Sequence, residues 1–261
     1  RNKIATILST MDEKIDLIGQ KIKQTQQLKV GLMQKLFSTG VGVQDKDGNW
    51  QPHTKFHELG EMNAPISWIR TELGSKLTKI VGGGTPSKSN PDFWNGNIPW
   101  ASVKDFKSSK LSASLIKDTI TIDGVENSST NLIEPGVIVI PTRMALGKVA
   151  ITEDPVAINQ DLKALYPSSG INNNFLFYWL ESQENKIKSL GSGSTVAGIR
   201  LEVLRALELI YPKNEIEQQK IAEILSTVDA KVMLLQKQKS ETQLLKNGLM
   251  QKLLTGEWRV P

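Results

Sequence analysis

Basic side chains stand beside apolar runs that predict buried strands. The run Val137–Ile140 is apolar throughout, as expected of a strand buried on both faces, and Arg143 follows it three residues later. Lys148 precedes a second such strand, at 149–151. A guanidinium or ammonium group fixed at a strand end can bind a phosphate or a guanine. A salt-bridged structural arginine is the alternative interpretation.

Three consecutive glycines, at 82–84, precede Thr85, Ser87 and Lys88. The backbone amides of a glycine run can approach a phosphate closely, and the hydroxyl and ammonium groups beside them favour such a contact. A tight turn beneath a sheet is the alternative. The run is not a dinucleotide-binding motif, because the G-x-G-x-x-G spacing and a following long helix are both absent from the sequence.

Enzymatic chemistry has little support in the sequence. It contains no cysteine, which excludes thiolate catalysis and disulfides. His53 and His57 lack a third ligand nearby, so they are expected to be solvated and no metal site is predicted. The stretch Asn90–Phe93 resembles the tetrapeptide with which adenine methyltransferases hold their target base, but its third residue differs and no glycine-rich turn for a methyl donor occurs. We therefore predict no catalytic residue and no cofactor.

Composition indicates an ordinary globular protein. The 261 residues are 39% hydrophobic and 23% charged, enough for one large or two modest domains. No run approaches 18 apolar residues and no export leader is recognised, so a cytoplasmic location is expected. The net charge of +5 suits a polyanionic partner without requiring one.

A repeated helix organises the chain. Residues 220–253 repeat residues 3–36, with 20 of 34 aligned positions identical. In both copies apolar residues recur at alternating intervals of four and three, the heptad pattern of helices that pack lengthwise. Because the intervening chain leaves the end of the first helix and enters the start of the second, we predict an antiparallel pair. Further along, the contact line is predicted to pass through Thr25 and Lys29, with their equivalents Thr242 and Lys246, while the apolar set shifts to Leu28 and Leu32 or to Leu245 and Leu249.

The rest of the chain is predicted from local patterns. Strands are expected at 66–70 and around 120, a short helix at 72–81, and an amphipathic helix at 172–189. Trp100 and Phe106 are expected inside and Lys104 outside. The predicted fold class is α+β, a mixed β-rich domain on an antiparallel coiled coil. Its domains are a first helix at 1–37, a linker at 38–60, the β-rich domain at 61–213, and a second helix with a tail at 214–261.

These residues together resemble the specificity (S) subunit of type I restriction-modification systems. The repeated helices are similar to that family's conserved spacer regions, and Glu217–Ala222 matches its E-Q-x-x-I-A motif. The middle resembles a target recognition domain in several short motifs: Gly83–Ser87, Ile98–Trp100, Pro141–Arg143 and Asn159–Asp161. A full subunit has two such domains. This chain resembles the carboxyl half with the central helix, as a fragment or a naturally short form.

The resemblance implies a non-catalytic, sequence-specific DNA-reading subunit. It implies that one recognition domain reads one half of a bipartite target in double-stranded DNA. The partners it implies are methyltransferase (M) subunits, restriction (R) subunits through them, and a second S chain as a homodimer. A coiled-coil adaptor without DNA binding and a self-contained adenine methyltransferase are the alternatives.

Eight residues are the candidates for DNA contact. Five cations are predicted to bind phosphates or bases, and three polar residues to support them by hydrogen bonding. Thr85 and Arg143 belong to the family-wide pattern, so they are better suited to positioning the backbone than to choosing bases. The residues that choose bases are expected within 107–130. The eight candidates are Lys88, Lys104, Arg143, Lys148, Arg200, Thr85, Ser87 and Asn159.

Overall fold

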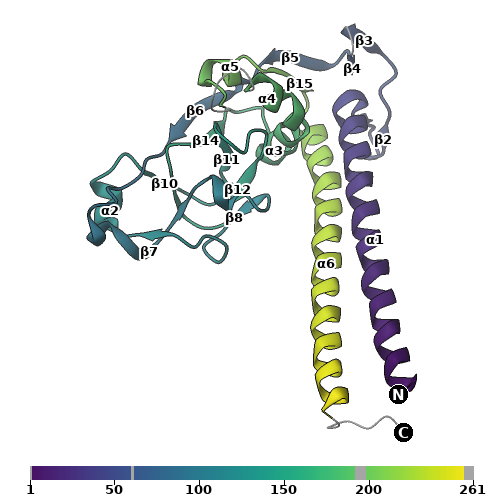
Figure 1. Cartoon of the computed structure of the whole chain (residues 1–261). Coiled ribbons are helices and arrows are strands. Elements are labelled where there is room, and N and C mark those ends of the chain that lie inside the picture. The colour runs from purple at the N-terminus through teal and green to yellow at the C-terminus, as the bar shows by residue number, and fades with distance from the viewer. Residues whose placement is uncertain (1, 60–61, 192–197, 256–261) are drawn as a thin grey trace. The chain divides into compact units, whose positions relative to one another are not determined.

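Two compact units make up the chain. The computed structural model describes residues 2–59, 62–191 and 198–255; residues 1–36 with 223–261 form one unit and residues 37–222 the other. Two long helices supply the first unit, α1 (Asn2–Thr39) and α6 (Glu215–Leu254), shown in purple and in green to yellow in Figure 1. None of the described helices is long and apolar enough to cross a membrane.

The two helices of the first unit run in opposite directions. Lys29 pairs with Asp229 at 2.7 Å between Nζ and Oδ1, and Lys246 pairs with Asp12. Because the earlier residue of α1 meets the later residue of α6, the pair is antiparallel, and this prediction is confirmed. The two ion pairs are also equivalent under the sequence repeat, since Asp12 aligns with Asp229 and Lys29 with Lys246. The pair therefore has an approximate internal twofold axis.

The contact between the helices follows the heptad pattern. Ile15 and Ile18 are buried on α1, and Val232 and Leu235 are buried on α6. The same spacing continues through polar residues, because Thr242 is only 8% exposed. We call this line of contact the seam.

The predicted shift of the apolar set is wrong for Leu28 and Leu245, whereas the predicted places of Thr242 and Lys246 in the seam are confirmed. Leu28 and Leu245 are 56% and 57% exposed. Thr242 and Lys246 keep their places in the seam instead. The Thr242 hydroxyl donates to the carbonyl of Gln238 one turn earlier, and the Lys246 ammonium reaches Asp12, so polar atoms in the seam are satisfied without displacing it.

The second unit is a β-rich body with short helices. Its strands are β1 (Val43–Gln44), β2 (Trp50–Gln51), β3 (Phe56–Leu59), β4 (Met62–Pro65), β5 (Trp68–Glu72), β6 (Leu77–Gly82), β7 (Trp94–Ala101), β8 (Lys110–Leu111), β9 (Thr119–Ile120), β10 (Asn131–Ile133), β11 (Ile138–Pro141), β12 (Ala150–Thr152), β13 (Val156–Ile158), β14 (Leu162–Pro167) and β15 (Glu208–Pro212). Its helices are η1 (Leu73–Lys76), η2 (Pro91–Phe93), η3 (Val103–Asp105), α2 (Ile122–Glu126), α3 (Asn173–Ser182), α4 (Glu184–Leu190) and α5 (Leu201–Arg205).

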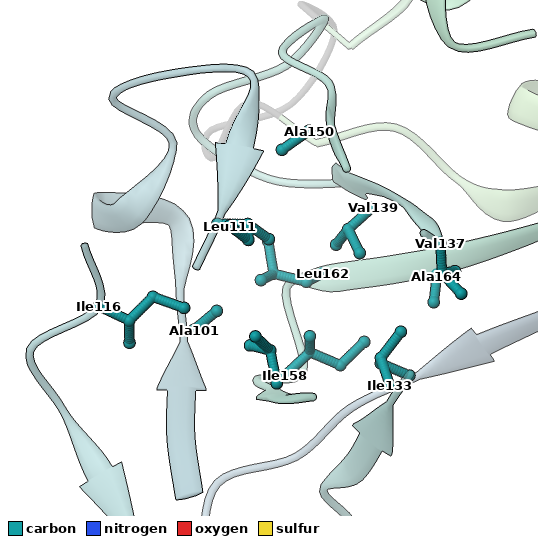
Figure 2. Close-up of a cluster of buried hydrophobic side chains, with 11 residues drawn as sticks. Ala101, Leu111, Ile116, Ile133, Val137, Val139, Ala150, Ile158, Leu162 and Ala164 are labelled. Carbon is teal, nitrogen blue, oxygen red and sulfur yellow. The ribbon is translucent and has the colours of Figure 1, made fainter. Parts of the chain in front are cut away.

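Two mixed sheets form the centre of this unit. The larger has the order β6-β14-β11-β12-β8 and the smaller β10-β13-β7-β9. Only β12 with β8 and β13 with β7 pair in parallel among the strands of these two sheets. Both sheets contribute to one apolar cluster, including Leu111, Val139, Ile158 and Leu162 (Figure 2). The mixed α+β class predicted from sequence is confirmed, and the apolar run at 137–140 lies in this core, as strand β11 from Ile138.

The predictions of which side chains are buried agree with the structure better than the predictions of helix boundaries. Trp100 is buried and Lys104 exposed, as expected, while Phe106 is only partly buried. The helix predicted at 72–81 is wrong, because this stretch forms η1 and then strand β6, which pairs with β14. Propensity there yields to sheet pairing. The helix predicted at 172–189 is divided into α3 and α4, and the Ser182 hydroxyl bonds the carbonyl of Trp179 at the break.

The start of α6 carries a buried carboxylate. Glu217 is 2% exposed, and its Oε1 accepts hydrogen bonds from the amides of Val41 and Gly42, each at 3.0 Å. The Trp68 indole donates to Oε2 at 3.2 Å, and His53 Nε2 lies 2.9 Å from Oε1. The expectation that His53 is solvated is therefore wrong, since the carboxylate supplies a buried partner that sequence spacing did not reveal. His57 is exposed as expected.

The neighbouring amide side chain joins α6 to α3. Gln218 is fully buried; its Nε2 donates to the carbonyls of Gly170 and Pro212, and its Oε1 accepts from the amide of Asn172. Each polar atom of the Glu217–Gln218 pair is thus used within the second unit. The motif that resembles the family's helix entry therefore anchors the start of α6 in the β-rich body.

Candidate nucleic-acid interface

Backbone hydrogen bonds join the turn 159–161 and the preceding residue to the ends of several strands. The amide of Asn159 donates to the carbonyl of Ala101, where β7 ends, at 3.0 Å. The amide of Gly84, after β6, donates to Ile158 at 3.0 Å, and that of Thr142, after β11, donates to Asp161 at 2.7 Å. Three loops that the sequence singled out separately are therefore held together at one edge of the β-rich unit.

Asn159 stabilises this turn from inside. Its side chain is buried, with the residue 6% exposed, and its Oδ1 accepts from the amide of Asp161 at 3.1 Å. Its amide group lies 3.4 Å from an Asp161 carboxylate oxygen. The side chain of Asn159 therefore positions Asp161.

The glycine run packs against the turn. A Cβ at Gly83 would lie 1.9 Å from the carbonyl oxygen of Ile158, and one at Gly84 would lie 2.1 Å from the Ser129 hydroxyl. Both glycines are therefore explained by close packing of the backbone in a tight turn, which was the alternative to a phosphate contact. Thr85 follows at once and donates from Oγ1 to Gln160 Oε1 at 2.5 Å.

Arg143 projects from the same edge. Its side chain is 63% exposed, and its Nε lies 3.9 Å from an Asp161 carboxylate oxygen. The backbone around it is paired on both sides, through Thr142 with Asp161 and through an isolated bridge with Gly198. The backbone that carries the guanidinium is therefore anchored, while the guanidinium itself is open to solvent.

Lys163 belongs to this edge, although sequence reasoning passed over it. Its Nζ donates to the carbonyls of Gln160 and Leu162, at 2.8 and 3.2 Å. Burial lowers the pKa of Lys163, the charge of Arg143 lowers it further, and Asp161 acts in the opposite direction. The charges of Arg143 and Lys163 thus both lie near the carboxylate of Asp161. The sequence feature that could have indicated Lys163 is its position two residues after Asp161.

The other candidates lie outside this cluster. Lys148 pairs with Glu184 at 3.3 Å, and Lys104 pairs with Asp118, whose hydrogen bond raises the pKa of Lys104. The Ser87 hydroxyl contacts Ser89. Lys88 and Arg200 are exposed, and neither side chain forms a hydrogen bond or ion pair with the described residues. The structure therefore brings together Thr85, Arg143 and Asn159, and Arg200 directly follows Ile199, whose amide bonds the Arg143 loop at Thr142. Among the described residues, no side-chain hydrogen bond or ion pair joins the other four to these residues.

Two neighbouring lysines lower the pKa of Glu184. Burial acts to raise its pKa, but hydrogen bonds from Lys188 and Lys148 outweigh burial, and the net pKa is lowered. The carboxylate therefore stays ionised at neutral pH and holds Lys148 against α4. The described residues contain no group of three or more potential metal ligands.

The chain falls in the class of DNA specificity subunits. The model of the type I restriction modification DNA specificity domain matches residues 68–244, and the chain belongs to this family. A specificity subunit named MjaIX, from Methanocaldococcus jannaschii, is 29% identical over 199 residues, which is 75% of this chain and 44% of that protein. A specificity subunit from Escherichia coli is 37% identical over 161 residues, or 59% of this chain and 39% of that protein.

Solved structures show the same fold. The HsdS subunit from Thermoanaerobacter tengcongensis superposes with a TM-score of 0.61 at 19% identity, covering 96% of this chain and 56% of that one. The S subunit of a type I system from M. genitalium gives 0.62 at 19% identity, covering 96% and 59%. The chain thus spans about half the length of the relatives it matches.

Proposed function

We propose that this chain is a sequence-specific DNA-recognition subunit of a type I restriction-modification complex. The β-rich unit reads one half of a bipartite target, and the helix pair docks methyltransferase subunits, through which restriction subunits join. Methyl transfer and DNA cleavage belong to those partners. The observation that supports this most directly is the exposed Arg143 guanidinium at an edge where three strand-end loops meet, in a chain of this family.

The direct test is methylation of the genome. Sequencing the methylome of cells that carry this chain and its methyltransferase should reveal a bipartite motif that is lost when the gene is deleted. In gel shifts with the methyltransferase present, affinity should fall steeply as salt rises, because phosphate neutralisation releases counterions. Flat or absent binding would favour a protein adaptor. Binding of labelled S-adenosylmethionine by the chain alone would favour a methyltransferase.

Arg143→Ala should weaken DNA binding by about 1–3 kcal/mol. The guanidinium is mostly exposed and its one carboxylate contact is long, so its loss should leave the midpoint of urea unfolding unchanged. Gel-shift titration at fixed salt measures the affinity. Arg70→Ala is the matched control, because Arg70 is 55% exposed and pairs with Glu208 on a strand outside the cluster. Equal losses in both variants would assign Arg143 a non-specific role.

The surface proposed to dock methyltransferase subunits lies on the helix pair. Leu17 and Leu28 are exposed on α1, and their equivalents Leu234 and Leu245 are exposed on α6, all between 49% and 57%. An internal twofold axis relating antiparallel helices stands perpendicular to the plane through both, so equivalent residues appear on the same face. Two copies of one partner can therefore bind two equivalent apolar strips side by side.

Two glycines mark these strips. Gly31 follows Leu28 by three residues, and Gly248 follows Leu245 in the same way, so each lies next to its leucine on the helix surface. A Cβ at either glycine would meet nothing within 4 Å. Glycine in a helix interior costs about 1 kcal/mol relative to alanine, and no contact with the described residues offsets this. Close approach of a partner supplies a reason for both.

Gly31→Ala with Gly248→Ala should therefore separate stability from docking. We expect the free energy of unfolding to rise by about 1 kcal/mol per site in urea titration. Co-purification with the methyltransferase should weaken, because a methyl group blocks the approach. Gly170→Ala, in the β-rich unit, offers an open Cβ at a positive φ and serves as a control that should leave docking intact. Unchanged docking by the double variant would move the docking surface elsewhere.

A second chain would supply the other half-site. Since the two helices carry equivalent seam residues, α1 of one chain can pair with α6 of another through the same ion pairs. Light scattering of the purified protein should then give twice the chain mass, and the methylated motif should be an inverted repeat. A monomer with a non-symmetric motif would exclude this arrangement.

A further inference from the structure

Met144 stands at the tip of the loop between β11 and β12 in a conformation that its side chain does not favour. Its φ is +62°, in the left-handed region, and among the described residues the only other non-glycine residue with positive φ is Asn95. Asparagine tolerates this region because its short polar side chain can bond locally, whereas methionine gains nothing comparable. Strain of this kind persists only where the surrounding structure imposes it, and it gathers at functional sites.

The surrounding loop imposes this conformation. Before Met144, the amide and hydroxyl of Thr142 both donate to the carbonyl of Asp161, and the amide of Ile199 donates to the carbonyl of Thr142. After it, the amide of Ala145 donates to the carbonyl of Arg143 at 2.8 Å. A Cβ at Gly147 would lie 2.6 Å from the Glu184 carbonyl, so the loop is also pressed against α4.

Packing within the chain does not explain the choice of methionine. The residue is 64% exposed, while Leu146, two positions later, is 3% exposed and provides the loop's apolar anchor. The loop therefore presents a large apolar side chain to solvent, rigidly and beside the exposed guanidinium of Arg143. A group placed in this way is suited to a partner that offers an anion or acceptor and an apolar group next to each other.

A base-pair edge in the major groove offers this combination. Thymine is the base whose edge carries a methyl group, at C5, and neighbouring phosphates and purines provide anions and acceptors. Building on the proposed function, we propose that Met144 is a specificity-determining residue that packs against the C5-methyl group of a thymine in the target half-site. Arg143 holds the backbone or an adjacent base beside it.

Replacing each thymine of the half-site by uracil, one at a time, tests this contact because uracil lacks only the methyl group. With the native chain and its methyltransferase, we expect one position at which uracil weakens binding about fourfold, the effect of losing one buried methyl group. Met144→Gly should lose a similar factor on thymine DNA and show no further loss on uracil at that position. Met144→Leu should retain the sensitivity to uracil.

Stability separates this role from a structural one. Glycine adopts a positive φ freely, so Met144→Gly should have a Tm equal to or above that of the native chain. Leu132→Ala, at another exposed apolar residue of the same unit, should leave binding and uracil sensitivity unchanged. Uracil sensitivity that is equal in native and Met144→Gly chains, or absent from the native chain, overturns the inference while DNA binding stands. Failure of the native complex to bind any DNA overturns the proposed function with it.

Discussion

Glu217→Ala should lower the free energy of unfolding by about 3–5 kcal/mol. The carboxylate is almost fully buried and accepts from two backbone amides and an indole N–H, with His53 alongside. Its removal leaves those donors without their acceptor, and each unsatisfied buried group costs about 1–3 kcal/mol. Urea unfolding monitored by tryptophan fluorescence measures the effect, because Trp68 is one of the donors.

Glu215→Ala is the matched control for that change. It removes an exposed carboxylate from the same first turn of α6, where only the helix dipole is affected. The expected loss is about 0.5 kcal/mol or less. A similar small loss for Glu217→Ala would mean that the buried cluster relaxes or takes up water.

Gly83→Ala should destabilise the β-rich unit by roughly 3 kcal/mol or more. The added methyl group would lie 1.9 Å from the carbonyl oxygen of Ile158 and 2.5 Å from that of Asn159. Both atoms belong to the backbone, so neither can move aside as a flexible side chain would. Because the turn 159–161 must shift, DNA binding in gel shifts should fall together with stability.

Gly82→Ala tests the same strand without the clash. Its Cβ would meet only the end of the Lys163 side chain, at 3.4 Å, an ordinary contact with a flexible group. We expect a change within about 1 kcal/mol and intact DNA binding. Equal effects at both positions would show that lost glycine flexibility, rather than the close approach, governs this loop.

The helix pair could be predicted from sequence because its signal is repeated. Two copies of one heptad pattern identify the partner of each helix, and the connecting chain favours the antiparallel arrangement. The position of the later seam could not be read from apolar residues alone. Lys246 occupies it because Asp12 lies opposite, and such a pairing depends on both helices at once.

The interface could be predicted only in part. Arg143 was identified because an apolar run fixes the strand before it, and this run is indeed buried. His53, Lys163 and Met144 were missed or misjudged for different physical reasons. His53 is buried by a carboxylate distant in sequence, Lys163 is held by loop contacts, and Met144 has a left-handed backbone conformation. Periodicity and composition indicate none of these features.

The two equivalent ion pairs in the helix unit also bear on length. If one helix slid along the other by a heptad, the apolar seam would re-form, but Lys29 and Lys246 would both leave their aspartates in the same step. Sliding of one helix along the other, in either direction, therefore costs two ion pairs instead of one. The two ion pairs therefore fix the register of the helices, and with it the length of the rod that the pair forms.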